Sequence, residues 1–121
     1  MEKHPKIPMT CSVRLRLRGT NSFYGIGVQE LLRLVQKTNS LQTAAATMEM
    51  SYSKAWKIIR TAEKELGFPL MVRRVGGAGG GGSQLTERGL DFVNRFEQFN
   101  SEANEAAGAL FKKYFGDLVE E

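Results

Sequence analysis

Residues 40–89 constrain the fold of this chain more than any other segment. Two short helical patterns flank the tight turn Met48-Glu49-Met50, and a hairpin with a glycine-rich tip and then a long helix follow them. This order of elements is that of a winged helix-turn-helix, in which the second helix of the pair enters the major groove of DNA. The predicted fold class is therefore mainly α with a small β wing (α+β), completed by a long C-terminal dimerisation helix.

The second helix of the predicted pair begins at Ser51 or Tyr52 and ends at Leu66, with Gly67 as its stop. At 100° per residue its side chains separate into an apolar and a polar side. The polar side contains no acidic residue, whereas a solvated helix face usually mixes both signs of charge. We therefore interpret it as a face that reads DNA. The apolar side is Ala55, Ile58, Ile59, Ala62 and Leu66, and the polar side is Ser53, Lys54, Lys57, Arg60, Thr61 and Lys64.

Two features have both a structural and a functional interpretation. Trp56 lies between the two sides of this helix, and we expect a packing anchor, with a base contact as the alternative. Arg14, Arg16 and Arg18 form the outer face of a predicted strand. We expect them to protect an edge strand from aggregation, and contacts with DNA phosphates are the alternative.

The N-terminal third is predicted to hold a tail, a strand and the first helix. Residues 1–9 contain two prolines and no periodicity, which is typical of a loose tail. Residues 10–18 alternate between apolar and polar side chains, which is the period of a half-buried strand. The first helix is expected over residues 28–38, with Asn39 as its C-cap and Ser40 as the N-cap of the next helix. Its core-facing stripe is Val28, Leu31, Leu32 and Val35.

Glycine fills six of the eight positions from 76 to 83. Gly77, Gly79 and Gly82 match the G-x-G-x-x-G pattern, but no second βα unit follows, so a dinucleotide site is excluded on context. We predict a flexible hairpin tip. Beside Arg73 and Arg74, a tip without side chains could lie close against a sugar-phosphate backbone.

The last helix is predicted to begin after Thr86, its N-cap, and to carry an apolar stripe with spacings of 4, 3, 4, 3 and 4. A helix of about 25 residues extends about 37 Å, farther than a domain of this size can cover. The distal part of the stripe therefore requires a partner, and a second copy of the chain is the simplest one. The stripe is Phe92, Phe96, Phe99, Ala103, Ala106 and Leu110.

Composition favours a single soluble domain that meets a polyanion. Residues 1–74 carry 13 Lys and Arg against 5 Asp and Glu, whereas residues 75–121 carry 4 against 8. A basic first part suggests contact with a polyanion such as nucleic acid. No apolar run approaches the roughly 20 residues of a membrane span, and no signal peptide is recognisable. One cysteine and one histidine argue against a disulfide framework or a metal site, so a cytoplasmic protein without cofactor is expected.

Several stretches together resemble one known family: Ser40-Leu41 with Ala44-Ala45, Met50-Ser51-Tyr52-Ser53-Lys54-Ala55-Trp56, Leu70-Met71-Val72-Arg73, the glycine tip, and Leu85-Thr86-Glu87-Arg88-Gly89. They are similar to the DNA-binding domain of ModE-type molybdate-responsive transcription regulators, relatives of the LysR winged-helix proteins. The resemblance implies a dimeric transcription factor with its recognition helix at residues 51–66. Family members that sense molybdate carry oxyanion-binding domains after this part. The sequence stops at Glu121, so a free-standing domain is expected, and molybdate binding is not expected in this chain.

The leading hypothesis is a sequence-specific DNA-binding transcription regulator that binds a near-palindromic site in double-stranded DNA as a homodimer. The alternative is a protein-interaction module that pairs with another protein through the winged helix and the long helix. An enzyme has no support, because no paired His/Asp/Ser set or metal-ligand cluster is present. The expected division is a tail at 1–9, a winged helix-turn-helix at 10–85, a dimerisation helix at 86–115 and a tail at 116–121. Candidate phosphate contacts are Thr43, Arg73, Arg74 and Arg60, and candidate base contacts are Ser51, Tyr52, Ser53, Lys54 and Lys57.

Overall fold

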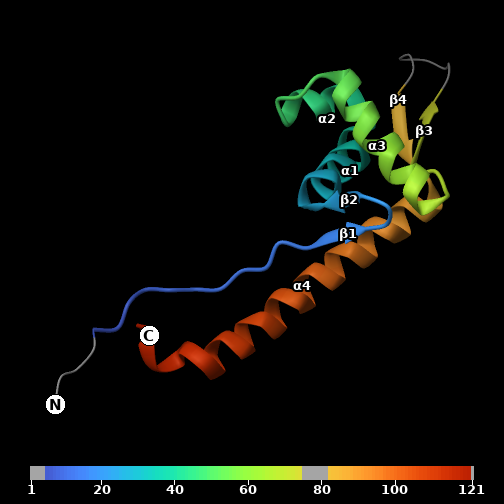
Figure 1. Ribbon diagram of the computed structural model, residues 1–121. Coiled ribbons are helices and arrows are strands. Elements are labelled where there is room, and N and C mark those ends of the chain that lie inside the picture. Colours follow the sequence, from blue (N-terminus) through green and yellow to red (C-terminus); the bar gives the residue numbers. More distant parts are fainter. Residues whose placement is uncertain (1–4, 75–81, 121) are drawn as a thin grey trace.

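The computed structural model describes residues 5–74 and 82–120, and its elements follow the predicted order (Figure 1). A small hairpin precedes three helices, a second hairpin follows them, and a long helix leads away from this body. The fold is therefore an α+β winged helix with a long C-terminal helix. The elements are β1 (Arg16–Arg18), β2 (Ser22–Gly25), α1 (Ile26–Thr38), α2 (Leu41–Thr47), α3 (Tyr52–Leu66), β3 (Met71–Arg74), β4 (Gly82–Leu85), α4 (Glu87–Phe115) and the 3-10 turn η1 (Gly116–Leu118).

Local capping sets the boundaries of α2 and α3. The Ser40 hydroxyl accepts a hydrogen bond from the amide of Thr43, and the Ser51 hydroxyl accepts one from the amide of Lys54. Asn39 ends α1 in the left-handed conformation, and Gly67 ends α3 in the same way with φ at 81°. The predicted roles of Asn39, Ser40 and Gly67 are confirmed, and Ser51 is the N-cap of α3, whereas α1 begins at Ile26, two residues before the predicted start.

The core lies where α1, α2 and α3 meet the first turns of α4. Every member of the predicted α1 stripe except the half-buried Val28 is fully buried. Alanines of α2 and α3 are fully buried as well, and their small side chains let these helices approach closely. The fully buried set includes Leu31, Leu32, Val35, Leu41, Ala44, Ala55, Ile59, Ala62, Leu70 and Val93.

The first hairpin differs from the strand predicted over residues 10–18. Only Arg16–Arg18 pairs as a strand, and its partner β2 was not predicted. The pairing is antiparallel, with an irregularity between Leu17 and Arg18. Residues 10–15 form no strand in the described structure. Their alternating pattern therefore reflects the partial burial of Val13 and Leu15 and not pairing in a β-ladder.

The wing is the antiparallel pair β3–β4, in which Met71 lies opposite Leu85 and Arg74 opposite Gly82. It is docked by its backbone, because the amide of Ser83 donates to the carbonyl of Asn39 at 3.0 Å. A Cβ atom at Gly82 would lie 2.6 Å from that carbonyl oxygen, so a side chain would separate the two. Most of the predicted glycine tip, residues 75–81, lies outside the described residues.

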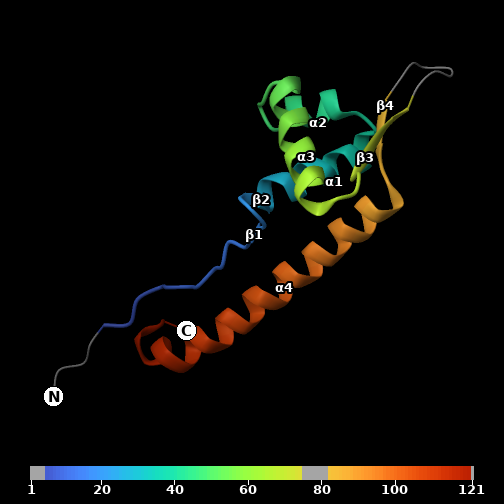
Figure 2. The same ribbon diagram turned by 45° about the vertical axis from the view of Figure 1, so that its right-hand side comes forward.

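Helix α4 starts against the wing and then leaves the body (Figure 2). The Thr86 hydroxyl accepts from the amide of Gly89 and donates to the carbonyl of Pro69, so the predicted cap is confirmed and also bonded to the loop before β3. A Cβ atom at Gly89 would lie 2.1 Å from the carbonyl oxygen of Leu70. Glycine at this position therefore allows close contact between helix and wing. At 1.5 Å per residue, the 29 residues of α4 extend about 43 Å.

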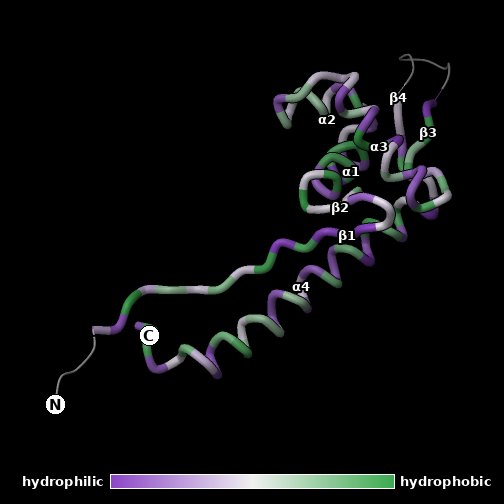
Figure 3. The backbone as a smooth tube through the Cα atoms, in the orientation of Figure 1, coloured by the Kyte–Doolittle hydropathy of each residue, from purple (hydrophilic) through white to green (hydrophobic). Residues whose placement is uncertain are grey.

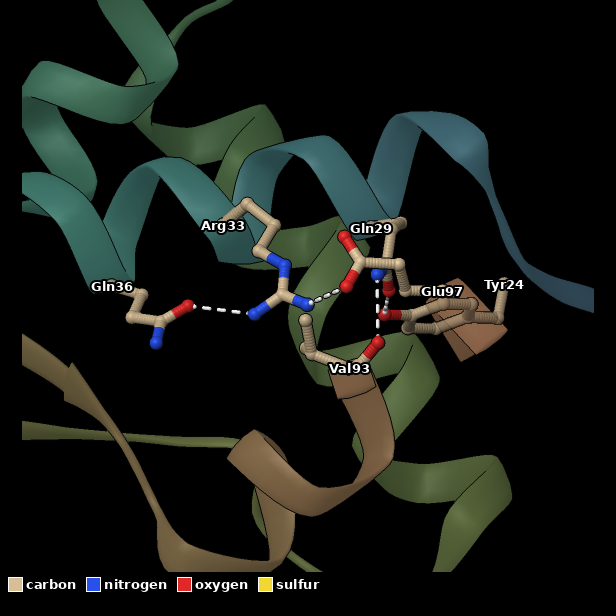
Figure 4. A network of polar contacts seen from close by, with 6 residues as sticks. All are labelled: Tyr24, Gln29, Arg33, Gln36, Val93 and Glu97. Atoms are coloured by element: carbon tan, nitrogen blue, oxygen red, sulfur yellow. Dashed lines mark hydrogen bonds and ion pairs between the residues drawn. The ribbon is translucent and has the colours of Figure 1, made fainter. Parts of the chain in front are cut away.

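Buried and exposed polar contacts join α1 to α4 (Figure 4). The phenol of Tyr24 donates to the side-chain oxygen of Gln29, whose amide nitrogen donates to the carbonyl of Val93 at 2.8 Å. Burial raises the pKa of the Tyr24 phenol, which keeps it protonated as a donor. Farther along, Arg33 forms an ion pair with Glu97 at 2.9 Å. These contacts fix the direction in which α4 leaves the body.

Residues 7–13 of the N-terminal segment lie beside the distal half of α4, whereas residues 1–4 of the predicted tail lie outside the described residues (Figure 1). Asn104 of α4 accepts from the amide of Val13 at 2.9 Å and donates to its carbonyl. Ile7, near the N-terminus, forms a parallel bridge with Val119, near the C-terminal end of the described residues. The segment from Ile7 to Val13 is therefore hydrogen-bonded at both of its ends.

Candidate nucleic-acid interface

The face of α3 that carries no acid is open to solvent in the structure. Its predicted polar side chains are all exposed, while Ala55, Ile59 and Ala62 on the opposite side are fully buried. The predicted division of this helix into two sides is therefore confirmed as geometry. The exposed set consists of Ser53, Lys54, Lys57, Arg60, Thr61 and Lys64.

The acidic residues of α3 are turned towards neighbouring elements. Glu63 accepts hydrogen bonds from the amides of Leu70 and Met71, at 2.8 and 3.3 Å, and so holds the start of the wing. Glu65 accepts from the amide of Thr20 in the turn between β1 and β2. Each carboxylate thus joins α3 to one hairpin. The outward face of the helix, which the sequence pattern predicted to be free of acids, consequently keeps an unmixed positive charge.

A cluster of aromatic and guanidinium groups joins the start of α3 to the wing. Arg73 of β3 donates to the phenol of Tyr52 at 2.7 Å. Hydrogen bonding by Trp56 is the largest influence that lowers the pKa of this phenol, and Arg73 lowers it further. The guanidinium groups of Arg60 and Arg73 lie 5.0 and 5.4 Å from the centre of the Trp56 ring, within the range of cation–π attraction. The cluster holds β3 and α3 in one orientation.

Trp56 is half-buried, with its ring packed against the core and beside the two arginines. Its ring also meets that of Tyr52 edge-to-face, with centroids 6.3 Å apart. These contacts favour the interpretation of Trp56 as a packing residue. They also place it in the wall of an open hollow that it shares with Lys57, Arg60 and Arg73.

The remaining candidate DNA-binding residues surround α3. Ser51, Tyr52, Ser53 and Lys54 are exposed at its first turn, where a helix in the major groove meets base edges. Thr43 is exposed on α2, and Arg74 is exposed at the end of β3. The fold therefore gathers α2, the first half of α3 and the wing into one solvent-facing region.

The predicted dimerisation stripe divides into two parts on α4. Phe96 is only 3% exposed and packs edge-to-face on Tyr24, with centroids 4.9 Å apart. The half-buried Phe92 packs on Tyr24 and Phe68. Phe92 and Phe96, the first two residues of the predicted stripe, therefore pack against the body of their own chain.

The stripe beyond Phe96 is not covered by the body. Phe99 is 50% exposed and Leu110 is 56% exposed, while Ala106 is also exposed and Ala103 is half-buried. Tyr114 and Phe115 add further exposed aromatic surface at the end of the helix. Apolar residues recur along this distal part, which lies away from the body (Figure 3).

Across residues 5–74 and 82–120, no group of three or more His, Cys, Asp or Glu side chains is placed to hold a metal ion. None of the described helices combines the length and the apolar character that crossing a bilayer requires.

Comparison with known proteins agrees with this geometry. Residues 29–90, about half of the chain, match the model of the bacterial regulatory helix-turn-helix protein, lysR family. A molybdenum transport protein ModE from Azotobacter vinelandii is 34% identical over 83 residues, which are 69% of this chain and 31% of that protein. The ModE of Herbaspirillum seropedicae is 31% identical over 94 residues, or 66% of this chain and 35% of the relative.

A third relative is named as a regulator. The transcriptional regulator ModE of Haemophilus influenzae is 34% identical over 76 residues, which are 60% of this chain and 30% of the relative. The chain thus spans about a third of the length of the curated relatives that it matches. The matched segment contains α2, α3 and the wing.

Proposed function

Because this chain belongs to the lysR family of bacterial regulatory helix-turn-helix proteins and carries a ModE-type winged helix, we propose that it is a sequence-specific transcription regulator of the cytoplasm that binds double-stranded DNA as a homodimer. The observation that carries the proposal is the outward face of α3. That face combines exposed lysine, arginine and hydroxyl side chains, and both flanking carboxylates bond to backbone amides elsewhere.

We assign base contacts to the first half of α3 and phosphate contacts to the residues around it. Lys54 and Lys57 can donate to the N7 and O6 acceptors of guanine, which the major groove presents. Arg73 and Arg74 of the wing, Arg60 and Thr43 are proposed to contact the backbone, which positions the protein without reading sequence. The base-reading set is Ser51, Tyr52, Ser53, Lys54 and Lys57.

The homodimer rests on the exposed stripe of distal α4. A contiguous apolar surface of this kind is uncommon on soluble monomers, and a second α4 supplies a matching one. We assign the pairing surface to Phe99, Ala103, Ala106 and Leu110. A two-fold dimer would contain two α3 helices. A dimer with two recognition helices reads two half-sites about one helical turn apart. The operator is therefore expected to be a near-palindrome.

The experiment that tests this function starts from genomic fragments selected by the purified chain. Affinity for the selected duplex and for a random duplex is then measured for Lys57→Ala, Lys54→Ala and Arg74→Ala, with Lys112→Ala near the end of α4 as the control. The two α3 variants should lose about 1–3 kcal/mol on the selected duplex only, because each loses a base contact. Arg74→Ala should weaken both duplexes alike, and Lys112→Ala neither.

A protein-interaction module is the second candidate, favoured by the exposed stripe of α4 alone. This second function would be the correct one if the native chain had no affinity for any duplex at low salt and still bound another protein through α4. Equal losses on both duplexes for all the α3 and wing variants would instead show that the reading face is wrongly assigned.

A further inference from the structure

A second basic hollow lies on the side of α3 away from the wing. It has a volume of about 520 Å³ and is bounded by the β1–β2 hairpin, the two residues before it, the start of α1, and α3. Its floor is apolar and includes Tyr24, Val28 and Ile58. Arg14 and Arg16 line one wall, and Lys54 and Lys57 of the reading face line the other. The hollow therefore brings the residues at and just before β1 next to the proposed recognition helix.

The charge of this hollow is positive throughout. The ionisable side chains in its lining, other than the phenol of Tyr24, are the four basic ones, with no carboxylate among them. In the described part of the chain, ion pairs join Arg33 to Glu97 and Arg95 to Asp91, and none of the four takes part in either. A concave surface with low-dielectric walls and unneutralised cations concentrates a positive potential, which attracts a polyanion.

The two hollows beside α3 share Lys57. In the hollow on the wing side, Lys57 lies with Arg60 and Arg73. In the second hollow it lies with Arg14 and Arg16. The β1–β2 hairpin and the wing lie on different sides of α3 (Figure 2). A helix in the major groove has one sugar-phosphate backbone on each side, because the two strands border the groove. The wing can meet only one of them.

We propose that Arg14 and Arg16 bind the phosphates of the DNA strand on the side opposite the wing, so that α3 is held between two backbone contacts. This inference rests on the proposed function and adds an element to it that lies before the family match at residues 29–90. Protection of an edge strand explains positive charge on β1. It does not explain why Arg16 of β1 and Arg14, which precedes β1, line the same hollow as the reading lysines.

The test compares two double variants of the full chain on the selected duplex and on a random duplex. Arg14→Gln with Arg16→Gln removes the proposed contacts. Arg18→Gln with Lys112→Gln removes the same net charge from positions that do not line the hollow. Glutamine keeps a polar side chain of similar length at these exposed positions, and thermal unfolding of both variants verifies that they fold.

Each lost phosphate contact lowers the slope of log affinity against log salt by about 0.9. The Arg14/Arg16 variant should therefore show a slope smaller by about 1.8 for every subunit bound, with equal losses on both duplexes, and the control should keep the native slope. Ethylation interference should lose its signal at phosphates on the side opposite those lost in Arg74→Ala. An unchanged slope, or lost phosphates on the same side as Arg74→Ala, would overturn the inference.

Two further results separate this inference from its alternatives. If the native chain binds no duplex, the proposed function itself fails, whereas native binding with an unchanged slope in the Arg14/Arg16 variant refutes only the second contact. Inorganic phosphate is also compared with chloride at equal ionic strength. Equal inhibition by both is expected. Extra inhibition by phosphate that disappears in the Arg14/Arg16 variant would assign the hollow to a free anion and overturn the contact with DNA.

Discussion

Phe96 and Phe99 lie three residues apart on α4, yet one is 3% exposed and the other 50%. The body, formed by β1 to β4, α1 to α3 and the first turns of α4, surrounds Phe96 with its own core. Distal α4, from Phe99 to Phe115, meets the N-terminal segment through backbone contacts such as those of Asn104 to Val13. Apolar residues that have the same spacing in the sequence are therefore buried in the core of their own chain in the first region and exposed in the second.

The largest expected effect is the contrast between these two phenylalanines. Phe96→Ala should cost about 3–5 kcal/mol of unfolding free energy, because it leaves a cavity beside Tyr24. Phe99→Glu should leave the body intact and dissociate the proposed dimer. Denaturation at several protein concentrations distinguishes them, since only an effect on association depends on concentration. If sedimentation shows that the native chain is a monomer at every concentration, Phe99 does not lie at a dimer interface.

Two glycines of α4 test the same difference between the body and distal α4. Gly89→Ala places a Cβ atom against the backbone of Leu70 and should cost about 1–3 kcal/mol, because the backbone must shift to accept it. Apart from its chain neighbours and the backbone of its own helical turns, a Cβ atom at Gly108 meets no atom of the described residues within 4 Å. Gly108→Ala should therefore stabilise the helix by about 0.8–1 kcal/mol. Thermal unfolding measures both. A destabilising Gly108→Ala that also weakens association would show that paired helices approach closely at this glycine.

The smallest expected effect concerns the contacts between α4 and the N-terminal segment. Asn104→Ala removes hydrogen bonds to the backbone of Val13 and should cost about 0.5–1.5 kcal/mol. Amide exchange of Val13 should accelerate, while exchange in the core of α1 should not change. Gln98→Ala, which removes only an exposed contact to Glu102 of the same helix, is the control. Unchanged exchange at Val13 in Asn104→Ala would mean that the segment does not depend on this residue.

Elements with local causes could be predicted from the sequence. Helix boundaries at Ser40, Ser51, Thr86 and Gly67 follow from hydrogen bonds and backbone conformations that involve residues close together in the chain. The two sides of α3 follow from helical periodicity alone. The candidate DNA-binding residues could be named for the same reason, because the exposed side of an amphipathic helix is set by its own sequence.

Contacts between distant residues were decided by the tertiary structure. β2 was missed because a strand of four residues carries little pattern, and its pairing with β1 depends on the packing of β2 against α1 and α3. The sequence pattern did not indicate that the carboxylates of Glu63 and Glu65 would accept hydrogen bonds at the start of the wing and in the first hairpin. Phe96 shares its spacing with Phe99, and only the position of Tyr24 shows which of them is covered.

Periodicity and capping, which act within about four residues, thus determined the helix-turn-helix and its cationic face from the sequence by itself. The meeting of Arg14 and Arg16 with Lys54 and Lys57 around one hollow was decided only by the fold. The physical reason is that this meeting joins side chains about 40 residues apart, whose positions depend on the packing of the hairpin against α3 and not on any local preference of either segment.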